Sequence, residues 1–166
     1  ELITLIDGVN VTELTQDHEF VTINAVKTSS QGESDSFNVK SPILIAADGR
    51  DSFCRRALGV GANEHDYGQV ALVTTVQTSL PHEQQAFERF APQGPLALLP
   101  LCGENRRSIV WTVPKGTEQE WLGDANDTRF LDALQVTFGN RAGRFEKTGK
   151  RFAYPLSQVL AERQAI

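Results

Sequence analysis

The residues of this chain whose types and spacing suit chemistry lie together near the end of its first third. An apolar run, Ile43–Ala47, leads directly into Asp48 and Gly49, and Ser52 and Arg55 follow at intervals of three. A carboxylate and a glycine at the carboxyl end of a strand are typical of a ligand-binding turn, because open α/β sheets bind their ligands there. The pattern predicts a small-molecule site at this turn, and an ordinary turn after a strand is the alternative.

Two elements must position this turn. The run Ile43–Ala47 is apolar at every position, which is typical of a parallel strand buried on both faces. After the turn, Ser52 is a suitable N-cap residue, and we expect a short helix over Phe53–Leu58 that stops at Gly59.

The rest of the chain predicts mainly antiparallel strands. Apolar and polar residues alternate in three segments near the N-terminus, and a polar cluster at 31–36 predicts a turn between the last two. A long β-branched run predicts a central strand in the middle section, and prolines mark the ends of several shorter strands. The expected strands are 9–12, 20–26, 37–40, 69–78, 87–90, 96–99, 108–113 and 150–154, the last ending at Pro155.

Helices are expected late in the chain. Thr117 is suited to cap a helix over 118–122. Asp127 is suited to cap a longer amphipathic helix that stops at Gly139. The residues expected on its buried face are Phe130, Leu131, Leu134 and Phe138.

Composition and charge argue against several classes of function. The chain has 166 residues and a net charge of −5, and an acidic surface argues against nucleic acid as a partner. Cys54 and Cys102 have no CxxC spacing, so we expect reduced thiols in a cytosolic setting. The histidines have no metal-ligand spacing, and no apolar run approaches the roughly 20 residues of a membrane-spanning helix. Because the chain begins at Glu1 and contains no Met, we expect it to be part of a longer protein.

Residues 46–55, with the sequence AADGRDSFCR, resemble the DG motif of class A FAD-dependent aromatic hydroxylases, the para-hydroxybenzoate hydroxylase type. The motif has roughly the form Gly-Ala-Asp-Gly-x-x-Ser-x-x-Arg, and this chain has Ala46 at its first position. Residues 86–101, 108–111 and 149–156 are similar to the middle domain of the hydroxylases of ubiquinone biosynthesis. The resemblance covers nearly the whole chain.

The resemblance implies a fold and a division into domains. The implied fold is α+β (α/β): the central β-sheet substrate domain of a para-hydroxybenzoate-hydroxylase-like protein with part of its FAD-binding domain, truncated at both ends. Residues 1–68 are expected to be the partial FAD-binding domain, and 69–154 the substrate-side antiparallel sheet with its helices. Residues 155–166 are expected to begin the return to the FAD-binding domain.

The resemblance also implies an activity. Its members are monooxygenases that use FAD, NAD(P)H and O2 to hydroxylate a phenol, here a polyprenylated one, and the flavin carries the chemistry. No residue of this chain is therefore expected to be catalytic or to bind a metal. The Gly-x-Gly-x-x-Gly turn that binds ADP belongs before residue 1, and a second Gly-Asp segment belongs after residue 166. We therefore expect this chain alone to be free of FAD and inactive.

Residue roles follow from the matched positions. Asp48, Gly49, Ser52 and Arg55 are the implied cofactor-binding residues. Asp48 would accept hydrogen bonds and position the turn, and Gly49 would let the backbone approach the flavin nucleotide closely. Arg55 would supply positive charge near phosphate or brace Asp48.

Leu98, Pro100 and Trp111 are the residues expected to form the wall that faces the substrate ring, because they lie where the family's middle sheet covers the flavin. For each of them a place in the core of the sheet is the alternative.

Two other functions stay open. A sibling hydroxylase of the same pathway would act at another ring position, and a non-catalytic β-rich module would bind an apolar ligand or a protein. The expected partners are a polyprenylphenol substrate and enzymes of the ubiquinone pathway. The expected location is the cytoplasm, with peripheral contact to the inner membrane, and exposed sheet edges favour self-association.

Overall fold

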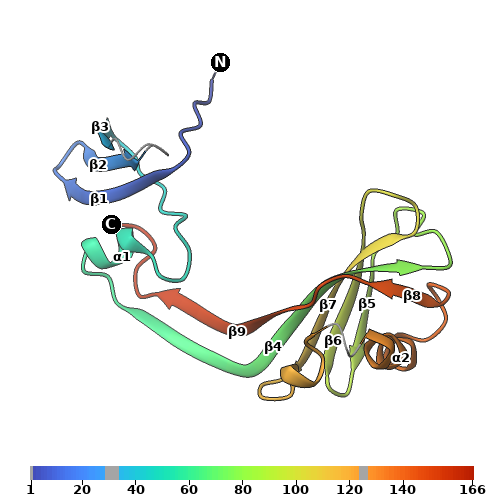
Figure 1. Cartoon of the computed structure of the whole chain (residues 1–166). Helices are drawn as coiled ribbons and strands as arrows, with labels where there is room; N and C mark the ends of the chain where they lie inside the picture. Colours follow the sequence, from blue (N-terminus) through green and yellow to red (C-terminus); the bar gives the residue numbers. More distant parts are fainter. Residues whose placement is uncertain (1, 29–33, 124–126) are drawn as a thin grey trace. The chain divides into compact units, whose positions relative to one another are not determined.

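The computed structural model describes residues 2–28, 34–123 and 127–166, which divide into two compact units. Unit 1 contains the chain up to Glu64 together with Val159–Ile166, and unit 2 contains His65–Gln158. The chain thus leaves unit 1, forms unit 2 and returns (Figure 1). This division lies within a few residues of the expected domain boundaries, and the roles expected of those domains stay predictions.

Unit 1 contains a three-stranded antiparallel sheet of β1 (Val9–Gln16), β2 (Val21–Thr28) and β3 (Ser34–Ser41), in that order. Ala25 is buried, as the alternation of apolar residues over 20–26 predicts, and Leu14 is buried beyond the end of the first expected strand. The three expected N-terminal strands are therefore confirmed, each somewhat longer than the sequence indicated.

The polar turn expected at 31–36 falls partly on residues 29–33, which lie outside the described part of the chain. Ser34–Ser36 belong to β3, so for them the expectation is wrong. Polar side chains did not signal a turn here because the strand has a polar face. On that face Asn38 donates a hydrogen bond to Asn24, and Asn24 donates one to Glu13.

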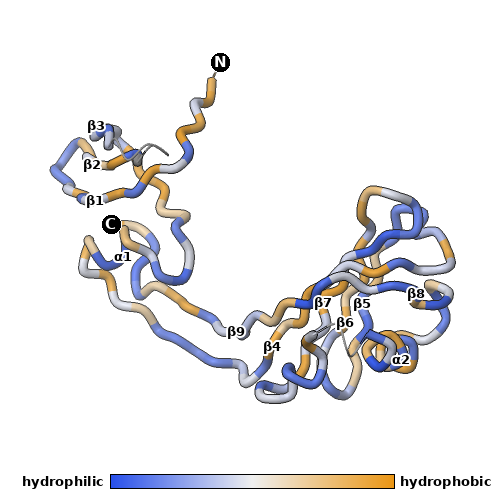
Figure 2. Tube along the Cα trace, viewed as in Figure 1, coloured by the Kyte–Doolittle hydropathy of each residue, from blue (hydrophilic) through white to orange (hydrophobic). Residues whose placement is uncertain are grey.

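The buried strand expected over Ile43–Ala47 is wrong: these residues form no strand, and Ile43 and Ile45 are 73% and 83% exposed. The part of the tube that joins β3 to α1 is hydrophobic over much of its length (Figure 2). An apolar run becomes a buried strand only where other strands pair with it and other layers cover it. No strand of the described residues pairs with this run.

Unit 2 is built on an antiparallel sheet with the order β5-β6-β7-β4-β8, and β9 also pairs with β4. The antiparallel sheet expected in the middle of the chain is therefore confirmed. Its strands are β4 (Ala62–Thr78), β5 (Phe87–Ala91), β6 (Gly94–Pro100), β7 (Arg106–Pro114), β8 (Phe145–Thr148) and β9 (Phe152–Ala161).

Three strands of this sheet differ most from expectation. β4 begins at Ala62 rather than at residue 69, because its polar first part is also paired as a strand. β8 was not expected at all. β9 runs through Pro155 instead of ending there, which a strand at the edge of a sheet tolerates because one side of it needs no hydrogen bonds.

Helix α2 (Asp127–Phe138) covers one face of this sheet. Its residues Phe130, Leu134 and Phe138 are buried, as the sequence predicts, and Gly139 follows with a positive φ of 84°. The helix expected over 118–122 is only a 3-10 turn, Glu118–Glu120, whose N-cap residue makes no side-chain cap bond.

A compact core lies between α2 and the sheet. It contains apolar residues from β4, β6, β7, α2 and β8 and from the segment between α2 and β8. These are Val70, Leu72, Val76, Leu96, Leu98, Ile109, Trp111, Val113, Phe130, Leu134, Phe138, Ala142 and Phe145. The sheet-dominated α+β architecture expected from the sequence is therefore confirmed. Within the described residues, no helix is long and apolar enough to cross a bilayer.

Candidate functional site

The turn Asp48–Ser52, which we call the DG turn, leads into α1 (Phe53–Ala57) in unit 1. Gly49 has a φ of 78°, a conformation that other residues adopt only with strain. A Cβ placed on Gly49 would meet no atom within 4 Å. The backbone of this turn is therefore open on the Gly49 side, which suits the close approach of a ligand.

Asp48 and Ser52 together satisfy the first turn of α1. Ser52 is the N-cap residue, and its Oγ accepts a hydrogen bond of 2.9 Å from the backbone N–H of Arg55. Asp48 Oδ2 accepts one of 2.9 Å from the backbone N–H of Cys54. Both side chains thus bind N–H groups that the helix itself leaves free. The cap that the sequence predicted at Ser52 is confirmed.

The Asp48 carboxylate is held firmly in its charged form. A hydrogen bond from Ser52 and further ones from Cys54 lower the pKa of Asp48 to about 2, although burial opposes the shift. Burial and the neighbouring Asp48 raise the pKa of the Cys54 thiol, so this buried thiol stays protonated near neutral pH. Asp48 is therefore a permanent hydrogen-bond acceptor at neutral pH and not a proton donor.

Arg55 supports the backbone of the DG turn. Its Nη1 donates to the carbonyl oxygen of Arg50 at 2.9 Å, and the Arg50 guanidinium in turn pairs with Glu64 at 3.2 Å. No charge effect from Arg55 contributes to the low pKa of Asp48. The sequence predicted that Arg55 could brace Asp48, and the hydrogen bond that Arg55 makes is to the carbonyl oxygen of Arg50. A contact between Arg55 and phosphate stays a prediction.

The structure places Leu98 and Trp111 in the core of unit 2. Their side chains are 0% and 2% exposed and pack on the face of the sheet that α2 covers. The Trp111 ring lies 5.3 Å from that of Trp121 and 6.0 Å from that of Phe130, measured between centroids. These contacts give both residues a packing role, and their contact with a substrate stays a prediction.

Pro100 is half-buried at the end of β6. It lies opposite Arg107 of β7, whose guanidinium is buried. Its expected place in a substrate wall also stays a prediction.

The opposite face of the same sheet is the one that α2 leaves uncovered. Val73, Ala97 and Val110 lie side by side on β4, β6 and β7 and are half-buried. Leu99, one position from Leu98, is 40% exposed on this face. Sequence reasoning missed these residues. Residues 96–99 are all apolar, so the sequence does not show which alternate residues of this strand face α2.

The comparisons with known proteins agree with this fold. The family described as FAD binding domain matches residues 3–164. "Ubiquinone hydroxylase UbiL" of Rhodospirillum rubrum is 37% identical over 130 residues, which are 78% of this chain and 30% of that protein. Human "Ubiquinone biosynthesis monooxygenase COQ6, mitochondrial" is 36% identical over 112 residues, 67% of this chain and 23% of that protein. The chain thus spans a third or less of these relatives' length.

Two solved structures show the same fold at low identity. The flavin-dependent monooxygenase PieE, in complex with FAD and substrate, aligns over 96% of this chain and 28% of its own, with a TM-score of 0.64 and 17% identity. The p-nitrophenol 4-monooxygenase PnpA of Pseudomonas putida aligns over 94% and 39%, with a TM-score of 0.64 and 16% identity. Because the family match spans almost every residue, this chain belongs to the FAD-binding domain family, as its DG motif predicted.

Proposed function

We propose that this chain is the DG-turn and substrate-sheet portion of an FAD-dependent monooxygenase that hydroxylates a polyprenylated phenol in ubiquinone biosynthesis. The observation that carries the proposal is the DG turn, with a fixed Asp48 carboxylate beside the open backbone at Gly49. Its occurrence in a chain 37% identical to a ubiquinone hydroxylase supports the substrate class.

The residues of the DG turn fit a flavin nucleotide. Gly49 leaves space where a side chain would exclude a ligand, and Asp48 offers an ionised acceptor for hydroxyl groups of the cofactor. Bound FAD, reduced by NAD(P)H, would supply the oxygen-transfer chemistry with O2. The chain's own contribution is to hold and orient the cofactor and to exclude water from the reaction.

The face of the sheet that α2 leaves uncovered is our proposed substrate wall. Its half-buried side chains Val73, Ala97 and Val110 form an apolar row, and Leu99 extends it. An apolar wall suits a phenol ring with a hydrocarbon tail. We prefer these residues to Leu98 and Trp111, which are enclosed by α2.

The test is to express the gene that encodes this chain and to purify its product without added flavin. We expect a yellow protein whose released cofactor is FAD and which oxidises NAD(P)H when a polyprenylphenol and O2 are present. A folded, colourless product that does not bind added FAD would overturn the proposal. If that product instead retains an apolar ligand, the chain is a binding module.

The ring position is a separate question within the same function. A gene deletion followed by identification of the accumulated quinone precursor distinguishes a hydroxylase of one ring carbon from its siblings. We propose that 2-polyprenyl-6-methoxyphenol is the substrate, so this compound should accumulate in the deletion strain.

A polyprenyl tail also bears on where the protein works. We propose that the protein is cytoplasmic and meets its substrate, and other enzymes of the pathway, at the surface of the inner membrane. Co-sedimentation with vesicles that contain a polyprenylphenol should exceed co-sedimentation with vesicles that lack it. Equal binding to both would contradict this proposal.

A further inference from the structure

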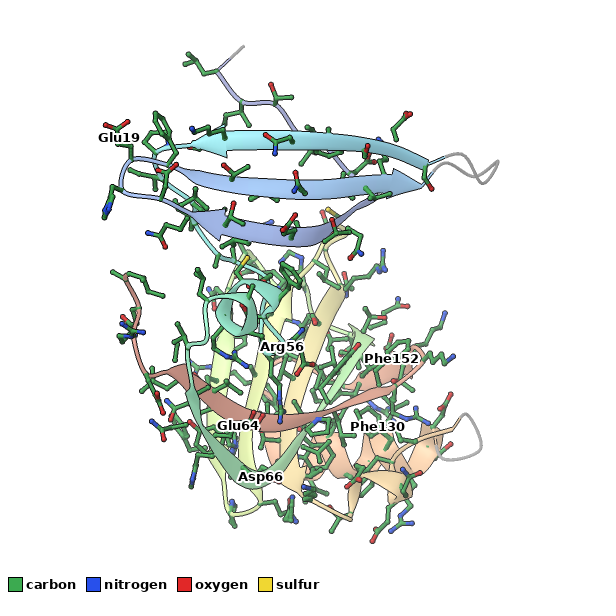
Figure 3. All side chains as sticks on the ribbon, turned by 90° about the vertical axis from the view of Figure 1, so that its left-hand side faces the viewer. Glu19, Arg56, Glu64, Asp66, Phe130 and Phe152 are labelled. Atoms are coloured by element: carbon green, nitrogen blue, oxygen red, sulfur yellow. The ribbon has the colours of Figure 1, made fainter. Side chains whose placement is uncertain are left out.

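Arg56 makes the same kind of contact as Arg55, although it lies outside the DG motif. Its Nη1 donates to the carbonyl oxygen of Asp51 at 2.7 Å, while Arg55 Nη1 donates to that of Arg50 at 2.9 Å. Two adjacent arginines of α1 thus each reach back to one of two adjacent carbonyls of the DG turn. Arg56 is labelled on α1 in Figure 3.

Helix α1 does not need these side-chain bonds for its own ends. Ser52 and Asp48 bind its first N–H groups, as described above. At its other end, the N–H groups of Leu58, Gly59 and Val60 donate to carbonyls of the helix. The two guanidinium bonds are therefore additional, and they act on the DG turn.

The positive charges of Arg55 and Arg56 are directed at carbonyl dipoles and not at carboxylates. Within the described ranges, neither forms an ion pair with an acidic side chain. A carbonyl oxygen repels an anionic group, and a guanidinium bound to it offsets that repulsion. A turn braced in this way suits the diphosphate of a nucleotide.

We propose that Arg56 is a positioning residue that, together with Arg55, holds the DG turn in the conformation that receives FAD. Arg56 acts through the carbonyl of Asp51, and a direct bond from Arg56 to the cofactor is not part of the proposal. The identity of the ligand rests on the proposed function. The effect of Arg56 on the conformation of the DG turn does not depend on that function.

The first test measures the turn without any ligand, by hydrogen–deuterium exchange of the backbone amides of residues 54–56, which donate hydrogen bonds to Asp48 and Ser52 of the DG turn. We expect Arg56→Ala to speed their exchange about tenfold, the effect of losing one charged hydrogen bond of about 1.4 kcal/mol. Arg56→Lys keeps a donor and should restore most of the protection. Exchange in β1–β3 should not change in either variant.

Arg163→Ala is the matched control, because it removes one exposed arginine from the same unit without touching the DG turn. Unchanged exchange in Arg56→Ala, or an equal increase in Arg163→Ala, would overturn the proposal.

The second test measures the dissociation constant of FAD for the same variants made in the whole gene product, because we expect the chain alone to be free of FAD. We expect about tenfold weaker binding in Arg56→Ala and near-native binding in Arg56→Lys. Weaker FAD binding with unchanged exchange would show that Arg56 contacts the ligand directly, which contradicts a positioning role. If the native protein binds no FAD, the proposed function fails, while the exchange measurements still decide whether Arg56 holds the turn.

Discussion

At the scale of single residues, Asp48 shows how a carboxylate is fixed as an acceptor. Its pKa of about 2 lies below the ordinary value of 3.8, and the hydrogen bond from Ser52 is the largest cause. A lowered pKa in the folded state contributes stability above about pH 4. That contribution is lost as the pH falls toward 2. The DG turn should therefore keep its shape across the physiological range.

Ser52→Ala should raise the pKa of Asp48 toward 3.8, because the strongest hydrogen bond to the carboxylate is lost. The part of the acid-induced loss of stability that comes from Asp48 should then be smaller than in the native protein, because its pKa values in the folded and unfolded states lie closer together. Carbon-detected NMR titration of the side-chain carboxyls measures this shift. Asp17 is the internal control, because its lowered pKa depends mainly on the backbone N–H groups of Glu19 and Phe20 and should not move.

Gly49→Ala should weaken FAD binding more than it weakens the fold. A left-handed φ costs a non-glycine residue about 1–2 kcal/mol, and no atom lies near the added methyl group. Gly8 has a similar φ of 65° and similar open space, so Gly8→Ala is the matched control for this strain. Thermal unfolding and FAD titration measure both effects. Equal FAD affinities for the two variants would contradict a ligand role for Gly49.

At the scale of elements, the sequence predicts best what local pattern determines. The stripe of Phe130, Leu134 and Phe138 predicts α2, and β-branched runs predict most of the sheet in unit 2. It fails at Ile43–Ala47, because strand formation there depends on partners that local pattern does not contain. Local pattern also leaves the face of Leu98 undecided, because alternation gives two faces and only the position of α2 decides which one is buried.

Arg151, the residue directly before β9, is a buried arginine that contacts the start of α2. The sequence did not predict this contact. The Arg151 guanidinium is buried, donates to the carbonyls of Trp121 and Gly123, and pairs with Asp127 at 2.6 Å. It also lies over the ring of Phe130. The Arg151 side chain thus connects the start of α2 with the beginning of β9.

Arg151→Ala should lower the free energy of unfolding by about 3 kcal/mol, because it removes a buried guanidinium together with its hydrogen bonds to Trp121, Gly123 and Asp127. Arg129 pairs with Glu120 at 3.0 Å at the surface, so Arg129→Ala should cost only about 0.5 kcal/mol. Urea denaturation of the two variants makes the comparison. A similar loss in both would show that burial of Arg151 contributes little.

At the scale of the whole molecule, each unit carries one part of the proposed function. Unit 1 contains the DG turn, and unit 2 contains an antiparallel sheet with one face closed by α2 and the opposite face as the proposed substrate wall. The closed face determines stability. Side chains on the uncovered face can therefore be replaced to suit a different substrate without disturbing the core.

Neighbouring leucines of β6 test this division between stability and function. Leu98→Ala should lower the free energy of unfolding by about 2–5 kcal/mol, because the side chain is fully buried. Leu99→Ala should cost less than about 1 kcal/mol and should raise the KM for the polyprenylphenol. Chemical denaturation and steady-state kinetics measure the two effects. An unchanged KM in Leu99→Ala would argue against the proposed substrate wall.

The return of the chain to unit 1 affects the order in which the protein can fold during its synthesis on the ribosome. Val159–Ile166 belong to unit 1, and the N–H of Glu162 donates to the carbonyl of Gly61. That bond cannot form until the whole of unit 2 has been translated, a wait of roughly 5 to 20 s at ordinary elongation rates. Nascent unit 1 must therefore remain unfinished while unit 2 emerges, because its last segment is translated last.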